Sequence, residues 1–131
     1  AEDAPRGKET LLLVEDDPTV LTAGKKMLES LGYSVITATN GPQGLQLYTA
    51  YRDEIELVLT DLTMPKMSGQ ELYRAIATLN PSAKVLLISG YDMPQNGSQL
   101  YPPGLQGLVI KPFDIAGLGK AVREALDNCT S

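Results

Sequence analysis

The chain alternates short apolar runs with segments in which apolar residues recur at helical spacing, and this alternation restricts the fold more than any other feature. Strands are predicted at residues 11–14, 33–39, 55–60, 84–89 and 107–110. The first run has no polar alternation, which is typical of a strand covered on both faces. Strands that alternate with helices in this way indicate a doubly wound parallel sheet, so the expected fold class is α/β.

The predicted helices have recognisable boundary residues. Pro18 favours the first position of a helix that Gly32 terminates, and Ser68 with Glu71 forms a capping box for the third helix. Asp114 can cap the last helix. The second helix is marked by Leu45, Leu47, Tyr48 and Tyr51.

The connection between the fourth and fifth predicted strands is the weakest segment of this pattern. Parallel strands need a crossover, which is usually a helix. Residues 91–106 contain three prolines and two glycines, which leave room for about two helical turns. A short or degraded fourth helix is therefore expected.

Composition excludes several kinds of function. The chain has 131 residues, of which 43% are hydrophobic, and this is enough for one domain with a core. A net charge of −5 argues against binding to nucleic acid or to an anionic membrane surface. No histidine is present, which excludes a histidine metal site, a Ser-His-Asp triad and a phosphohistidine within the chain. The single cysteine, Cys129, fits a reducing compartment and is interpreted as part of a loose C-terminal tail.

Polar side chains gather where the predicted strands end, which is the edge at which open parallel sheets bind ligands. Three acids follow the first strand, one acid follows the third, a hydroxyl ends the fourth and an ammonium follows the fifth. In chain order these residues are Glu15, Asp16, Asp17, Asp61, Ser89 and Lys111.

This set of side chains favours phosphoryl chemistry. Clustered carboxylates without histidine or cysteine suit a hard cation, with Mg²⁺ favoured, and the ion offsets the repulsion among them. A hydroxyl and a lysine are donors for an anion, and with Mg²⁺ they commonly hold a phosphoryl group. No GxxxxGK[ST] loop is present, which excludes a P-loop nucleotide site. The residues therefore indicate phosphoryl transfer onto a carboxylate of the protein itself.

Four motifs follow one another along the chain: LLVEDDP, LVLTDLTMPKMSG, VLLISGY and IKPF. Together they resemble the receiver (REC) domain of two-component response regulators. The resemblance implies a flavodoxin-like (βα)5 fold with a five-stranded parallel sheet of order 2-1-3-4-5. The expected organisation is a flexible leader at residues 1–9, a receiver domain at residues 10–127 and a tail at residues 128–131.

The resemblance assigns the metal ligands by position. Asp16 would contact Mg²⁺ directly and Glu15 through water, while Asp61 and the backbone carbonyl of Thr63 would complete the protein's ligands. Asp17 precedes Pro18 and is better interpreted as a helix N-cap than as a metal ligand.

The same resemblance assigns the phosphoryl site. Asp61 would be the phosphoacceptor, Ser89 the switch hydroxyl that reaches the phosphoryl group, and Lys111 the lysine that pairs with it. The family often carries an aromatic switch residue where this chain has Leu108, so a switch driven by a ring is not expected.

The function implied is a phosphorelay switch. A phosphohistidine on a histidine kinase or a histidine phosphotransfer domain would donate to Asp61, and the domain would catalyse its own phosphorylation and dephosphorylation without an external substrate. The expected setting is cytoplasmic, with the receiver of a hybrid sensor histidine kinase favoured over a stand-alone regulator. Because the fourth helix is degraded, the isolated domain is expected to be monomeric rather than paired through its fourth and fifth helices.

Three alternatives remain open from the residues. One is a degenerate receiver that binds partner proteins without being phosphorylated. Another is a phosphatase with an aspartate nucleophile, although such families usually place a DxD motif after the first strand. The third is a flavin-binding flavodoxin, which the absorbance of the purified protein would reveal.

Overall fold

The structure is a computed structural model that describes residues 7–61, 67, 69–80, 83–89, 107–110 and 115–127. The elements follow the predicted alternation closely. In chain order they are β1 (Thr10–Val14), α1 (Pro18–Ser30), β2 (Ser34–Ala38), α2 (Gly41–Ala50), β3 (Ile55–Asp61), α3 (Gly69–Leu79), β4 (Val85–Ser89), β5 (Gly107–Ile110) and α4 (Ile115–Asp127).

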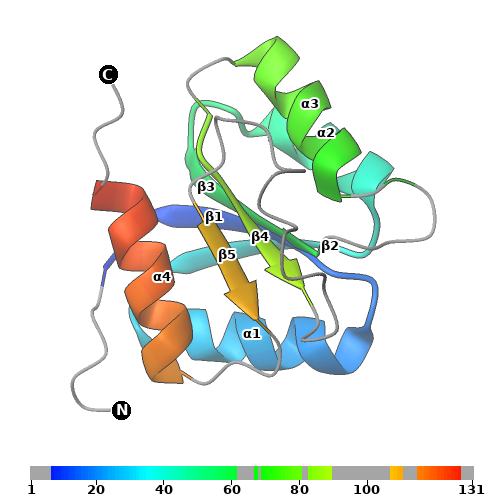
Figure 1. Cartoon of the computed structure of the whole chain (residues 1–131). Coiled ribbons are helices and arrows are strands. Elements are labelled where there is room, and N and C mark those ends of the chain that lie inside the picture. Colours follow the sequence, from blue (N-terminus) through cyan, green and yellow to red (C-terminus); the bar gives the residue numbers. More distant parts are fainter. Residues whose placement is uncertain are drawn as a thin grey trace.

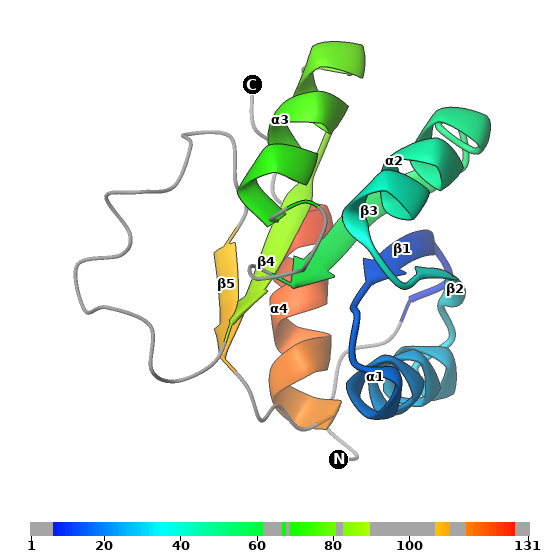
Figure 2. The ribbon, with the colours of Figure 1, turned by 90° about the vertical axis from the view of Figure 1, so that its right-hand side faces the viewer.

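The strands form one parallel sheet of order β2-β1-β3-β4-β5. Helices α1 and α4 cover one face of the sheet, and α2 and α3 cover the other (Figure 1, Figure 2). The predicted order is confirmed for β2, β1, β3 and β4, while β5 pairs with β4 at the edge. The expected short helix at residues 91–106 lies outside the described part of the chain.

Two apolar clusters fill the space between the sheet and its helices. Leu11 and Leu13 of β1 belong to the cluster that includes side chains of α1 and α4. Leu12 and Val14 point the other way, into the cluster with α2 and α3. Because successive side chains of a strand alternate between faces, burial on both sides explains why this run has no polar positions.

Capping residues explain where the helices begin and end. Asp17 caps α1 by accepting a hydrogen bond from the Thr19 backbone N–H at 2.9 Å, which confirms the prediction for Asp17. Gly32 follows α1 with φ +104°, a conformation that favours glycine. The predicted caps Ser68 and Asp114 lie outside the described residues, which resume at Gly69 and Ile115.

Residues 7–9, the last part of the expected leader, are bonded to the body of the domain. Gly7 N–H donates to the Leu31 carbonyl, and the Glu9 carbonyl accepts from Ser34 N–H, both at 3.0 Å. The Arg123 guanidinium of α4 donates to both carboxylate oxygens of Glu9, at 2.6 and 3.2 Å. This hydrogen bonding lowers the pKa of Glu9 from 4.5 to about 2.

Arg123→Met is expected to lower the free energy of unfolding at neutral pH by about 1 kcal/mol, because a paired and partly buried carboxylate loses its partner. Since the folded-state pKa of Glu9 is depressed, this stabilisation is present above pH 4.5 and is lost as the pH falls towards 2. Urea denaturation of both proteins across that pH window measures the difference. Lys25→Met is the control, because the Lys25–Glu29 pair is about half exposed at 3.9 Å and should change stability little.

Within the described residues, no helix combines the length and the apolar character needed to cross a membrane.

Candidate functional site

Two neighbouring strands bring three carboxylates together at one edge of the sheet. β1 ends at Val14 and leads into Glu15 and Asp16, while β3 ends on Asp61. Val14 pairs with Thr60 in the parallel ladder, so the two strand ends lie side by side. One carboxylate oxygen from each of Glu15, Asp16 and Asp61 lies within 4.8 Å of the others.

The three acids differ in their exposure to solvent. Glu15 is 1% exposed and Asp61 is 6% exposed, whereas Asp16 is exposed. Buried charges of one sign are costly unless a counter-charge is bound, and carboxylate oxygens are the ligands that Mg²⁺ prefers. The donor set therefore fits a hard divalent cation with one side open to solvent.

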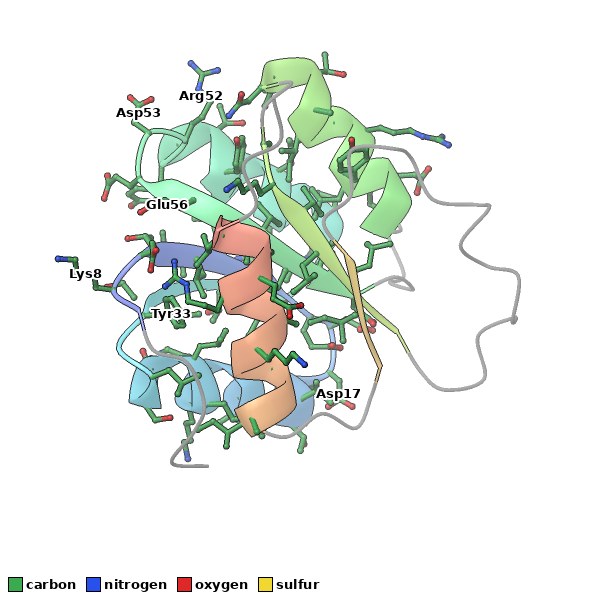
Figure 3. The ribbon with its side chains drawn as sticks, turned by 60° about the vertical axis from the view of Figure 1, so that its left-hand side comes forward. Lys8, Asp17, Tyr33, Arg52, Asp53 and Glu56 are labelled. Carbon is green, nitrogen blue, oxygen red and sulfur yellow. The ribbon has the colours of Figure 1, made fainter. Side chains whose placement is uncertain are left out.

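The backbone fixes Glu15 and turns Asp17 away from this cluster. Glu15 N–H donates to the Ala38 carbonyl of β2 at 3.0 Å, and Glu15 Oε2 accepts from Asp17 N–H at 3.0 Å. Asp17 sits at the beginning of α1, where its carboxylate caps the helix (Figure 3). Asp17, the third acid of the motif, is therefore a helix cap and is not part of the cluster.

The other predicted site residues are only partly located. Ser89 ends β4, whose residue Ile88 pairs with Asp61, so the Ser89 backbone lies at the same edge as the acids. The side chain of Ser89, and the whole of Thr63 and Lys111, lie outside the described residues. The structure therefore brings together Glu15, Asp16 and Asp61 and leaves the proposed phosphoryl contacts as predictions.

A polar cavity of about 210 Å³ lies at the opposite edge of the sheet, and none of the three acids lines it. Asn80 donates to the Tyr48 hydroxyl at 3.0 Å there, and the Lys84 ammonium donates to the Leu126 carbonyl at 2.7 Å. These hydrogen bonds satisfy polar groups where α2, α3 and α4 end. The cavity is thus remote from the acid cluster.

Asp16→Asn is expected to raise the free energy of unfolding without Mg²⁺ by about 1 kcal/mol and to weaken the stabilisation expected from added Mg²⁺. Unit charges 4 to 5 Å apart near a surface repel by about 3 to 4 kcal/mol before screening by salt. Thermal melting with and without Mg²⁺ measures both effects. Asp17→Asn is the matched control, because Asn also caps helices and should leave the Mg²⁺ response unchanged. Equal Mg²⁺ responses in wild type and Asp16→Asn would contradict Asp16 as a ligand.

Comparisons with known proteins agree with this fold. The model of the response regulator receiver domain family matches residues 11–123. The chain therefore belongs to the family of response regulator receiver domains.

Curated relatives include proteins with different overall functions. The sensor kinase CckA of Brucella abortus (strain 2308) is 33% identical over 92% of this chain, and the transcriptional regulatory protein GlrR of Escherichia coli (strain K12) is 33% identical over 89%. The chain spans only 13% of the first relative's length and 26% of the second's.

Solved structures of receiver domains have the same fold as this chain. A receiver domain protein from Clostridium thermocellum has a TM-score of 0.84 at 29% identity, covering 91% of this chain and 94% of that one. A chain of the CheX–CheY–BeF3–Mg²⁺ complex from Borrelia burgdorferi has a TM-score of 0.84 at 26% identity, with 92% and 90% covered. The receiver domain of the hybrid histidine kinase CckA has a TM-score of 0.75 at 26% identity, with 90% and 99% covered.

Proposed function

We propose that this receiver domain is a phosphorelay switch that accepts a phosphoryl group on Asp61 with Mg²⁺ bound. The observation that carries the proposal is the convergence of Glu15, Asp16 and Asp61 at one edge of the sheet. Asp61 is the acid that ends the central strand β3, while the other two approach it from the end of β1. A nucleophile beside two potential metal ligands is the arrangement that transfer to a carboxylate requires.

The reaction is a displacement at phosphorus. A carboxylate oxygen of Asp61 forms the new P–O bond, and the P–N bond to a histidine of the donor breaks with its electron pair leaving to the imidazole. This chain has no histidine, so the donor is a second protein or another domain, namely a histidine kinase or a histidine phosphotransfer domain. When bound, Mg²⁺ would neutralise charge shared between the acids and the phosphoryl oxygens.

In the proposal the receiver domain spans residues 10–127, and further residues within it complete the site. In the proposal Glu15 and Asp16 orient the metal, the Thr63 carbonyl adds a ligand, and Ser89 and Lys111 contact the phosphoryl group. The match of the family model to residues 11–123, which spans all of these positions, supports the set.

Phosphorylation would switch the domain by a local change of charge. The phosphoryl group brings about −1.5 to −2 charges to a site that already holds three acids. The Ser89 hydroxyl and the Lys111 ammonium would be drawn towards the phosphoryl group. Their movement would bias an equilibrium between inactive and active conformations. The controlled output, or onward phosphotransfer, then depends on which conformation a partner binds.

The favoured setting is the receiver of a cytoplasmic hybrid sensor histidine kinase, with a stand-alone regulator second. The similarity to the sensor kinase CckA over 92% of this chain supports this choice. The regulator GlrR is equally identical to this chain, and this similarity supports a stand-alone regulator as the second choice.

The test is intact-protein mass spectrometry after incubation with acetyl phosphate, with and without Mg²⁺. The expected result is a single phosphoryl adduct that forms only with Mg²⁺ and is removed by hydroxylamine, which cleaves acyl phosphates. A wild-type chain that binds Mg²⁺ but forms no adduct with acetyl phosphate or a phosphohistidine donor would overturn the proposal in favour of a degenerate, partner-binding receiver.

A further inference from the structure

We propose that Gly41 is a positioning residue for the Asp61 site and acts through Met67. The inference rests on the proposed function, because it concerns the same phosphoryl transfer. Gly41 is buried at the first turn of α2, and Met67 lies between Asp61 and the start of α3. The two residues come from different segments and meet beside the edge that carries the acids.

The contact between them leaves no room for a side chain on α2. A Cβ atom at Gly41 would lie 2.5 Å from Met67 Cβ, 2.9 Å from Cγ and 3.0 Å from Sδ. Carbon atoms in contact prefer separations of about 3.5 to 4.0 Å, so Met67 would have to move by roughly 1 Å. Its nearest atom is Cβ, which a change of rotamer does not move, so the shift falls on the backbone of Met67.

A shift at Met67 reaches the site because of where the residue stands in the chain. Met67 follows Asp61 closely in the chain and packs against the core cluster shared by α2 and α3. Because only five residues separate Met67 from Asp61 in the chain, we expect a displacement of Met67 to be transmitted to Asp61. A misplacement of about 1 Å at a reacting centre can slow a reaction by about a hundredfold.

Gly44 provides a matched control on the same helix. A Cβ atom there would lie 2.8 Å from a methyl carbon of Val14, again too close for contact. Val14 is held in the sheet on both sides, paired with Ala38 of β2 and Thr60 of β3. Crowding at Gly44 should therefore lower stability without displacing the strand end, whereas crowding at Gly41 acts on a residue outside the strand ladder.

The experiment compares wild type, Gly41→Ala, Gly44→Ala, Met67→Gly and the double variant Gly41→Ala/Met67→Gly. For each protein the measurements are melting temperature, the Mg²⁺ dissociation constant from calorimetry, the acetyl phosphate labelling rate, and the methyl NMR spectrum of labelled methionines. Gly41→Ala is expected to slow labelling by about tenfold or more and to shift the Met67 methyl signal. Gly44→Ala is expected to lower the melting temperature and keep the labelling rate.

The double variant tests whether Gly41 acts through Met67. All three atoms nearest the Cβ position belong to the Met67 side chain, so Gly41→Ala should cost little additional rate when that side chain is absent. Additive losses in the double variant, or equal slowing by Gly41→Ala and Gly44→Ala, would overturn the inference. If Gly41→Ala fails to fold, Met67→Gly removes the contact from the other side and should itself slow labelling.

Failure of the proposed function would be distinguishable from failure of this inference. If wild type binds Mg²⁺ but takes up no phosphoryl group, the proposed function fails. The Mg²⁺ dissociation constants then decide the role of Gly41, because a displaced Met67 should weaken Mg²⁺ binding in Gly41→Ala and leave it unchanged in Gly44→Ala. A wild type that binds no Mg²⁺ would overturn both proposals.

Discussion

Asp61→Asn will take up no phosphoryl group under conditions in which the wild-type chain is labelled. The amide that replaces the carboxylate is a poor nucleophile and forms no stable acyl phosphate, so labelling should fall by at least about a hundredfold. The change also removes one of the three charges that would hold Mg²⁺. Intact-protein mass after treatment with acetyl phosphate and Mg²⁺ measures the loss.

Asp53→Asn is the matched control for this substitution. Asp53 is an exposed aspartate in the turn before β3, at the opposite end of the sheet from Asp17 (Figure 3). Asp53→Asn should take up the phosphoryl group to the same extent as the wild-type chain. An adduct that survives in Asp61→Asn would move the acceptor role to Glu15 or Asp16, the other acids of the cluster.

Leu72→Ala will lower the free energy of unfolding by about 2 to 5 kcal/mol, the usual cost of emptying a buried leucine site. Leu72 is 0% exposed and belongs to the cluster beneath α2 and α3. Urea denaturation monitored by circular dichroism measures the change.

Leu79→Ala is the control within the same helix. Leu79 is 40% exposed and undergoes the same leucine-to-alanine exchange at the end of α3, so the difference between the variants is dominated by burial. We expect a change within about 0.5 kcal/mol at Leu79. Similar losses in the two variants would mean that the cluster does not dominate stability on this face.

The sequence was most informative where local chemistry decides structure. The unbroken apolar run before Glu15 predicted a strand covered on both faces, and Asp17 before Pro18 predicted the cap of α1. Parallel neighbours then place the residues after β1 and β3 at one edge, which is why Glu15, Asp16 and Asp61 could be grouped in advance.

Contacts between distant parts of the chain were not predictable in the same way. Tyr48 matched the helical spacing, but its bond to Asn80 depends on how α2 and α3 pack. Tyr51, placed on the same apolar stripe, lies beyond the end of α2 and is 42% exposed. The Glu9–Arg123 pair likewise joins residues that no local pattern relates.

The ion pair between Glu9 and Arg123 fastens the chain just before β1 to the last turns of α4, so both ends of the domain are held on one side of the sheet. Strand β1 starts, and helix α4 ends, at the edge of the sheet away from the acid cluster (Figure 1). Polypeptide joined before residue 7 or after residue 127 would therefore attach at the edge of the sheet opposite Glu15, Asp16 and Asp61. In the proposed function a donor protein would approach Asp61 from the edge that carries the acids, so partners fused at either terminus are not expected to obstruct it.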